Sequence, residues 1–135
     1  MKYLMVPLLL LSMSASAQWS LDHCIDGLIQ IESSGNKYAV GDNGKAVGIL
    51  QIHPIMVKEC NRLLGREEFT VFDRLHVDRS RMMCRVFLSY QIYKWRIAHD
   101  EYPTQVRLMS SWNTGNIFKK ANKSYIMKCR KQELI

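Results

Sequence analysis

The chain has 135 residues, 47% of them hydrophobic, with four cysteines and a formal net charge of +7. That length suffices for one compact domain with its own core and excludes a second domain. The basic balance favours anionic surroundings.

The first 17 residues have the features of a secretory signal peptide. Met1-Lys2 supplies a positive charge, residues 3–11 are apolar, and Ala15-Ser16-Ala17 is a small-residue cleavage site. The apolar run is too short for a permanent membrane helix, so we expect no stable membrane span. We predict a secreted or periplasmic protein with a mature domain of residues 18–135. Such a protein meets wall polymers and lipid headgroups rather than nucleic acid.

Residues 21–33 are predicted to form a helix with Ser20 as its N-cap. Its apolar residues have the spacing of one helical face: Leu21, Ile25, Leu28 and Ile29. Glu32 continues this face in the last turn. Burial and the negative end of the helix dipole would both raise the pKa of a carboxyl there. Glu32 is therefore a candidate proton donor near neutral pH, the alternative being a glutamate turned into water.

A Gly/Asn-rich stretch follows this helix. Asp42-Asn43-Gly44, between the apolar residues 38–40 and 46–47, predicts a short hairpin or a tight ordered loop. Segment 48–52 is too short and too apolar for a surface loop. We expect it to pack beneath the site of Glu32.

Helices dominate the rest of the chain. Pro54 is predicted to begin one and Gly65 to end it. We expect Phe69, Val71 and Phe72 to anchor the next connection to the core. Three further helices are predicted. The first is capped by Asp73 or Asp78 and runs to about His99, with an inner stripe of Val77, Cys84, Phe87, Leu88, Gln91 and Trp95. The second is capped by Thr104 and places Val106, Met109 and Asn113 on a buried face, and the third covers about residues 119–130.

Cys24, Cys60, Cys84 and Cys129 all lie in the predicted mature domain. An even count in an oxidising compartment predicts two disulfides with three possible pairings. We favour Cys24–Cys129 and Cys60–Cys84. Their spacing contains no C-x-x-C motif and no nearby histidine pair, so we predict no metal site.

Most basic residues are dispersed, but six gather near the end of the chain: Lys119, Lys120, Lys123, Lys128, Arg130 and Lys131. Two interpretations stay open for this cluster. It forms either a solvated helix face or a patch that binds a polyanion.

Several short motifs occur in a fixed order: Glu32-Ser33, Gly48-Ile49-Leu50-Gln51-Ile52, Trp112-Asn113-Thr114-Gly115 and a later Tyr125. In this order the chain resembles the soluble lytic transglycosylase and goose-type lysozyme family of peptidoglycan-cleaving enzymes. The resemblance covers about residues 21–128. Each motif alone recurs by chance, but three in order behind a signal peptide are a specific signal.

The resemblance implies an all-α lysozyme-like fold and cleavage of the β-1,4 bond between N-acetylmuramic acid and N-acetylglucosamine. Peptidoglycan glycan strands are then the partner, and no cofactor is implied. Glu32 takes the role of general acid that protonates the glycosidic oxygen. It then acts as base on the muramic 6-hydroxyl, which closes to a 1,6-anhydro product.

The same resemblance assigns Ser33, Gly48, Gln51, Trp112, Asn113 and Tyr125 to the substrate-binding region. Gly48 would allow close approach of sugar and Gln51 would order the cleft. Asn113 would bond sugar or backbone near Glu32. Trp112 replaces a usual tyrosine, which loses a hydroxyl and keeps a stacking face. Gln51 and Asn113 could equally be buried amides that bond backbone groups, and Tyr125 could be a core residue.

A hydrolytic lysozyme on the same fold is the nearest alternative function. An inverting hydrolase uses a second carboxylate roughly 6.5–9.5 Å from the acid, and Asp42 is the candidate. Asp42 could instead be an Asx-turn residue of the hairpin. A non-catalytic glycan-binding protein is an alternative of another class. The biological setting stays open, a secretion or envelope-spanning apparatus included.

Overall fold

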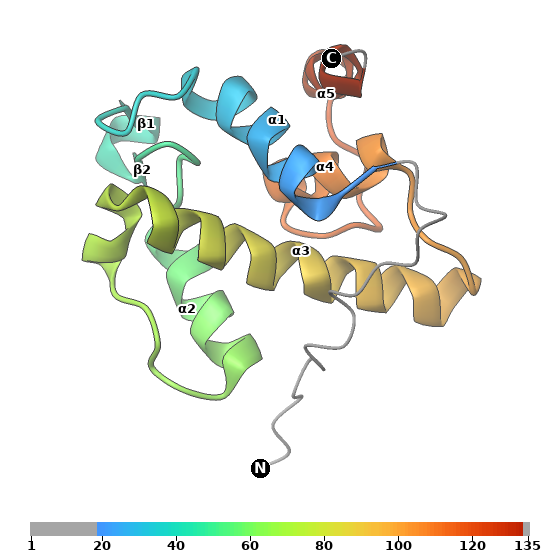
Figure 1. The fold of residues 1–135 in the computed structure, drawn as a ribbon, viewed down its shortest axis with the longest axis horizontal. Helices are drawn as coiled ribbons and strands as arrows, with labels where there is room; N and C mark the ends of the chain where they lie inside the picture. The colour runs from blue at the N-terminus through green and yellow to red at the C-terminus, as the bar shows by residue number, and fades with distance from the viewer. Residues whose placement is uncertain (1–18, 134–135) are drawn as a thin grey trace.

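The computed structural model describes residues 19–133, so the predicted signal peptide lies outside the described residues. The described chain is mainly helical, with one small antiparallel hairpin (Figure 1). Its helices are α1 (Leu21–Ser33), α2 (Pro54–Leu64), α3 (Val77–His99), α4 (Gln105–Thr114) and α5 (Lys123–Glu133). Strands β1 (Val40–Gly41) and β2 (Ala46–Val47) flank the 3-10 turn η2 (Asp42–Gly44), and a second 3-10 turn, η3 (Val71–Leu75), precedes α3. The predicted all-α class with a small hairpin is confirmed.

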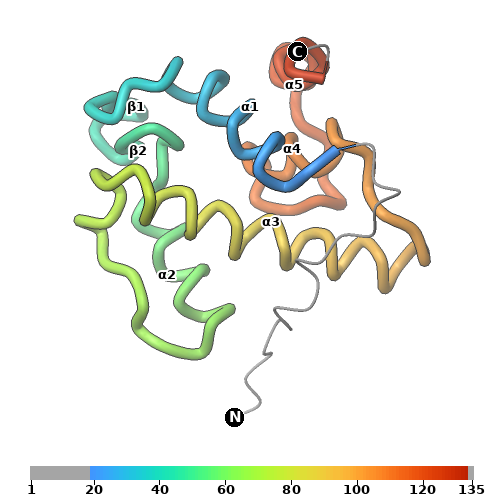
Figure 2. Tube along the Cα trace, viewed as in Figure 1, coloured from blue at the N-terminus to red at the C-terminus, as the bar shows by residue number. Residues whose placement is uncertain are grey.

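The long helix α3 runs across the middle of the molecule (Figure 1). It contacts α2 on one side and α1 and α4 on the other, and α5 contacts both α1 and α4. The tube view shows the hairpin following directly from the C-terminal end of α1 (Figure 2). Among the described helices, none combines the length and the hydrophobicity needed to cross a membrane.

The ends of the helices follow the signals in the sequence. The side chains of Ser20 and Thr104 each accept a hydrogen bond from the backbone N–H three residues further on, at 3.0 and 3.1 Å. Pro54 stands at the first position of α2, and Gly65 ends it with a φ of 71°. These four predictions are confirmed.

The start of α3 differs from the prediction. Its N-cap is His76, which makes no side-chain capping bond. Asp73 instead accepts a hydrogen bond from the backbone N–H of Thr70 at 2.8 Å and closes a capping box on η3. Asp78 lies within the first turn of α3. Neither predicted cap is therefore correct, because a separate 3-10 turn uses Asp73.

The apolar anchors expected before and within α3 are also partly wrong. Phe69 is buried as predicted, but Val71 and Phe72 are 40% and 72% exposed, because η3 turns them outward. Val77 is exposed and Trp95 is half-buried. The inner face of α3 is carried by the residues in the middle of the helix: Met83, Cys84, Phe87, Leu88, Gln91 and Ile92.

The last helix begins later than the predicted residue 119. The side chain of Asn122 accepts a hydrogen bond from the backbone N–H of Tyr125 at 2.9 Å, so it caps α5 there. A capping asparagine favours a helix start directly after it, at Lys123.

All four cysteines are free and buried in this structure, so the two predicted disulfides are wrong for it. Burial raises the pKa of Cys24, Cys60 and Cys129 to about 12, which keeps these thiols protonated. Cys60 donates to the carbonyl oxygen of Met83 at 3.3 Å. The cysteines therefore pack as small apolar side chains in the core.

Candidate active site

Glu32 lies in the last turn of α1, and the C-cap Ser34 that follows this helix has the left-handed conformation. Leu28 and Ile25, one and two turns earlier on the same face, are fully buried, and Glu32 itself is half-buried. Burial raises the pKa of the Glu32 carboxyl, and the nearby Asp42 carboxylate raises it further. The position predicted from periodicity therefore holds a carboxyl that is hard to ionise.

Tyr125 of α5 contacts this carboxyl directly. Its hydroxyl donates a hydrogen bond to Oε1 of Glu32 at 2.7 Å, across 93 positions of sequence. This bond and the positive charges of Lys128 and His53 lower the pKa of Glu32, but burial has the larger effect. Tyr125 is itself buried, and its pKa is raised by burial and by Glu32, so it remains a donor. The bond occupies Oε1 and leaves Oε2 to carry a proton.

Ser33 joins the end of α1 to segment 48–52. Its hydroxyl lies 2.7 Å from the carbonyl oxygen of Ile49 and 3.3 Å from that of Ile29. The shorter bond ties Ile49, which is buried, to the residue directly after Glu32. Ser33 therefore positions Glu32 against the segment expected beneath it.

Gly48 is required by the protein's own backbone. Its φ is +87°, and a Cβ built there would lie 2.0 Å from the carbonyl oxygen of Arg74. Its N–H also donates to the carbonyl oxygen of Ala39 at 2.9 Å. The resemblance implied that Gly48 makes room for sugar. In the structure, the space that a side chain at residue 48 would need is taken by the carbonyl oxygen of Arg74.

Gln51 bonds backbone groups of the hairpin region. Its Nε2 donates to the carbonyl oxygens of Ala39 and Gly48, both at 3.0 Å. Its own φ is 50°, an unusual value for a residue with a side chain. The side-chain amide of the half-buried Gln51 therefore holds the hairpin region to segment 48–52.

Trp112 is part of the core. It is 8% exposed, and its ring meets Phe87 edge to face at 5.5 Å. Its indole N–H donates to the carbonyl oxygen of Leu50 at 3.1 Å. The sugar-stacking face expected of Trp112 is therefore covered, and the side chain supports segment 48–52 from the α4 side.

Asn113 is exposed, which contradicts the buried position predicted for it. The buried face of α4 passes through Leu108, Met109 and Trp112, and Asn113 lies one step beyond that face. Among the described residues, no side-chain hydrogen bond of Asn113 is present. Its amide is available to a ligand.

Asp42 is paired with a residue that the sequence reading missed. Its Oδ2 lies 2.8 Å from Nε2 of His53, and the two side chains are 68% and 37% exposed. Both groups lie near enough to Glu32 to shift its pKa, in opposite directions. A histidine directly before Pro54, just after the 48–52 motif, was the available signal for this pair. In residues 19–133, no three histidine, cysteine or carboxylate side chains group as they would to hold a metal ion.

The comparisons with known proteins identify a family. The family model described as the transglycosylase SLT domain matches residues 12–135. No curated protein and no solved structure matches the chain. The match covers nearly the whole chain, so the resemblance seen in the motifs is confirmed, and with it the lysozyme-like all-α fold.

Replacing Gly48 by alanine should destabilise the fold strongly. Gly44 offers a matched control, because it has the same φ of +87° but nothing within 4 Å of an added Cβ. Gly44→Ala should cost about 1–2 kcal/mol from the left-handed conformation alone. Gly48→Ala should cost about 1–3 kcal/mol more, because a methyl group must also displace the Arg74 carbonyl. Urea unfolding of both variants measures the difference, and equal losses would contradict the packing role of Gly48.

Replacing Tyr125 by phenylalanine should raise the pKa of Glu32. The lost hydroxyl stabilises the ionised carboxylate, so its removal favours the protonated form. If activity requires protonated Glu32, the alkaline limb of the pH–rate profile should move to higher pH. Tyr93→Phe on α3 is the control, since its hydroxyl bonds no residue within 19–133. An unmoved limb in Tyr125→Phe would show that the hydrogen bond does not tune the acid.

Proposed function

Because the chain belongs to the transglycosylase SLT domain family, we propose that it cleaves peptidoglycan glycan strands as a lytic transglycosylase. The bond cut is the β-1,4 bond between N-acetylmuramic acid and N-acetylglucosamine, and the product carries a 1,6-anhydro-muramic end. The observation that carries this proposal is the half-buried Glu32 carboxyl with its raised pKa and its hydrogen bond from Tyr125.

In the proposed reaction, Glu32 first acts as a general acid. Its Oε2 gives a proton to the glycosidic oxygen while the bond to the muramic C1 breaks. The Glu32 carboxylate then takes the proton of the muramic 6-hydroxyl, whose oxygen closes on C1. No water is consumed. The Tyr125 hydroxyl stabilises the carboxylate between the two steps, because its hydrogen bond to Oε1 favours the ionised form.

The other residues assigned by the resemblance support the reaction in different ways. Ser33 bonds the end of α1 to Ile49, Gln51 bonds the hairpin region to Gly48, and Trp112 bonds Leu50 from the α4 side. The exposed amide of Asn113 is the remaining candidate for direct contact with sugar.

We propose further that the protein acts outside the cytoplasm, where its substrate lies. The predicted signal peptide at residues 1–17 supports this location. Service to a secretion or envelope-spanning apparatus stays a prediction from the same sequence features.

A hydrolytic lysozyme is the second candidate, and one observation favours it. Asp42 lies close enough to Glu32 to raise its pKa, so a second carboxylate is present on the hairpin. The ion pair with His53 orients that carboxylate. In a hydrolase it would activate the attacking water.

Replacing Glu32 by glutamine should reduce cleavage of purified peptidoglycan by about 10²–10⁴-fold, since a general acid typically contributes that much. Binding to peptidoglycan should persist, because glutamine keeps the size of the side chain. Sedimentation with insoluble peptidoglycan measures binding, and release of soluble fragments measures activity. Near-normal turnover in Glu32→Gln would refute the proposed mechanism.

The same variant should be at least as stable as the parent at neutral pH. The pKa of Glu32 is higher in the folded chain than in the unfolded chain, so the folded state binds this proton more tightly. The contribution to stability is therefore present at low pH and is lost as pH rises through the folded pKa. Thermal unfolding at pH 4 and pH 8 should show a smaller pH dependence in Glu32→Gln. A loss of stability at pH 8 would argue against a strained buried carboxyl.

Replacing Asp42 by asparagine separates the two candidate reactions. A transglycosylase does not need a second carboxylate, so Asp42→Asn should retain most activity and release anhydro-muramic ends. A hydrolase should lose most of its activity and release reducing ends. Mass spectrometry of the products distinguishes the ends, and His53→Gln controls for loss of the ion pair alone. If the parent releases reducing ends and Asp42→Asn does not, the protein is a hydrolase and the transglycosylase proposal is wrong.

A further inference from the structure

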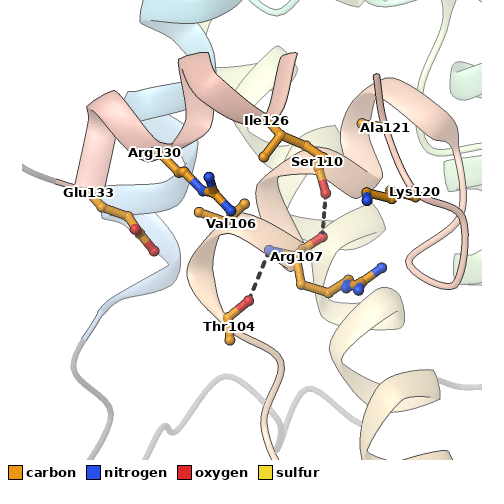
Figure 3. Close-up of a pocket in the computed structure, with 9 residues that line it drawn as sticks. All are labelled: Thr104, Val106, Arg107, Ser110, Lys120, Ala121, Ile126, Arg130 and Glu133. Carbon is orange, nitrogen blue, oxygen red and sulfur yellow. Dashed lines mark hydrogen bonds between the residues drawn. The ribbon is translucent and has the colours of Figure 1, made fainter. Parts of the chain in front are cut away.

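A cavity of about 360 Å³ lies between α4 and α5 (Figure 3). Three cationic side chains line it: Arg107, Lys120 and Arg130. One carboxylate, Glu133, lies at the end where Arg130 enters, and Lys120 lies at the opposite end (Figure 3). The proposed cleavage of glycan strands does not use these residues.

Among the described residues, the cations of the cavity form no ion pair, and they outnumber its one carboxylate, Glu133. Within residues 19–133, no carboxylate lies in ion-pair distance of Arg107, Lys120 or Arg130. The contrast is with five arginines of α2, α3 and their connection, each of which pairs with a carboxylate: Arg62, Arg66, Arg79, Arg81 and Arg85. The cavity therefore offers positive charge to an external ligand.

The position of one of these cations, Arg107, is partly fixed. The guanidinium of Arg107 lies 5.3 Å from the centre of the Trp95 ring, within range of a cation–π contact. The backbone of Arg107 is held as well, since its N–H donates to Thr104 and its carbonyl accepts from Ser110. A side chain fixed in this way loses less conformational freedom when it binds a ligand.

The lining combines three kinds of contact. The cations suit carboxylates, which form charge-assisted hydrogen bonds with them. Glu133 suits an ammonium group. Val106, Ala121 and Ile126 offer an apolar wall to methyl groups. A short peptide with carboxylates, an amine and alanine methyls would satisfy all three, and the peptide stems of peptidoglycan have this composition.

The cavity is joined to the candidate active site through α5. Tyr125 bonds Glu32, and the next residue, Ile126, lines the cavity. Adjacent residues of a helix point about 100° apart, so α5 presents one face to Glu32 and a neighbouring face to the cavity. Peptide stems are attached to the muramic sugar, which is the residue whose bond is cut.

We propose that the cavity between α4 and α5 binds the peptide stem of peptidoglycan, an inference that rests on the proposed function. The cations bind the stem carboxylates, Glu133 binds the free amine of the diamino acid, and the apolar wall receives the alanine side chain. The basic residues outside the cavity, including Lys123 and Lys131, draw the acidic stem toward it at low ionic strength.

Titration with the soluble tripeptide L-alanyl-γ-D-glutamyl-meso-diaminopimelate tests the binding directly. In ¹H–¹⁵N NMR spectra of the mature domain, shifts should concentrate on α4, α5 and the loop between them. Arg130→Gln should weaken binding by about tenfold or more, since hydrogen bonds to charged groups contribute about 1.5–3 kcal/mol. Lys58→Gln on α2 is the matched control, because it removes the same charge from an exposed site elsewhere.

Two results of this titration would overturn the proposal. One is the absence of shifts on α4 and α5 at millimolar tripeptide. The other is equal weakening in Arg130→Gln and Lys58→Gln, which would reduce the effect to net charge. Glu133→Gln should weaken binding of this tripeptide and leave unchanged a tripeptide with alanine as its third residue. Equal effects on both peptides would show that Glu133 does not bind the ammonium group of the diamino acid.

Activity measurements separate this proposal from the cleavage proposal. Arg130→Gln should raise KM on peptide-bearing peptidoglycan with little change in kcat, and should not affect glycan strands stripped of their stems by an amidase. An equal effect on both substrates would contradict a stem site. If the parent cleaves neither substrate, the proposed cleavage fails, while the NMR titration still decides whether the stem binds.

Discussion

Segment 48–52 forms a turn that is closed by the Gln51 N–H bond to Gly48 and by the bridge between Val47 and Ile52, and its buried carbonyl oxygens need further donors. Side chains supply them: Gln51 to Gly48, Ser33 to Ile49, Trp112 to Leu50 and Arg74 to Ile52. Three of these donors belong to the motifs by which the family is recognised. The motifs thus encode one mostly buried segment, four of whose carbonyl oxygens accept side-chain hydrogen bonds, and the residue directly after Glu32 is bonded to it.

Segment 48–52 and the side chains bonded to it form a frame, and this frame together with Tyr125 explains the chemistry proposed for Glu32. The carboxyl is fixed by its neighbours, since Ser33 ties the end of α1 to Ile49 and Tyr125 occupies Oε1. Burial alone would make the ionised form costly at every stage of a reaction. The hydrogen bond from Tyr125, with the positive charges nearby, moderates that cost. An acid that must later act as a base needs both influences.

Much of the fold followed from local signals, because helix caps and breakers act over a few residues. The burial of Glu32 also followed, since a helical face has a fixed period. Contacts between distant residues could not be predicted in this way. The bond from Tyr125 to Glu32 and the pair of Asp42 with His53 depend on how α5 and the hairpin pack. Asn113 was misplaced because a one-residue step on a helix separates a buried face from an exposed one.

The central claim is that this frame gives Glu32 a pKa above that of an ordinary glutamate. Titration of its side-chain carboxyl carbon by ¹³C NMR, assigned by the signal missing in Glu32→Gln, tests this most directly. The account predicts a titration midpoint clearly above the value of about 4.3 seen in model peptides. A midpoint at or below that value would show that Glu32 is an ordinary surface carboxylate and would contradict the account.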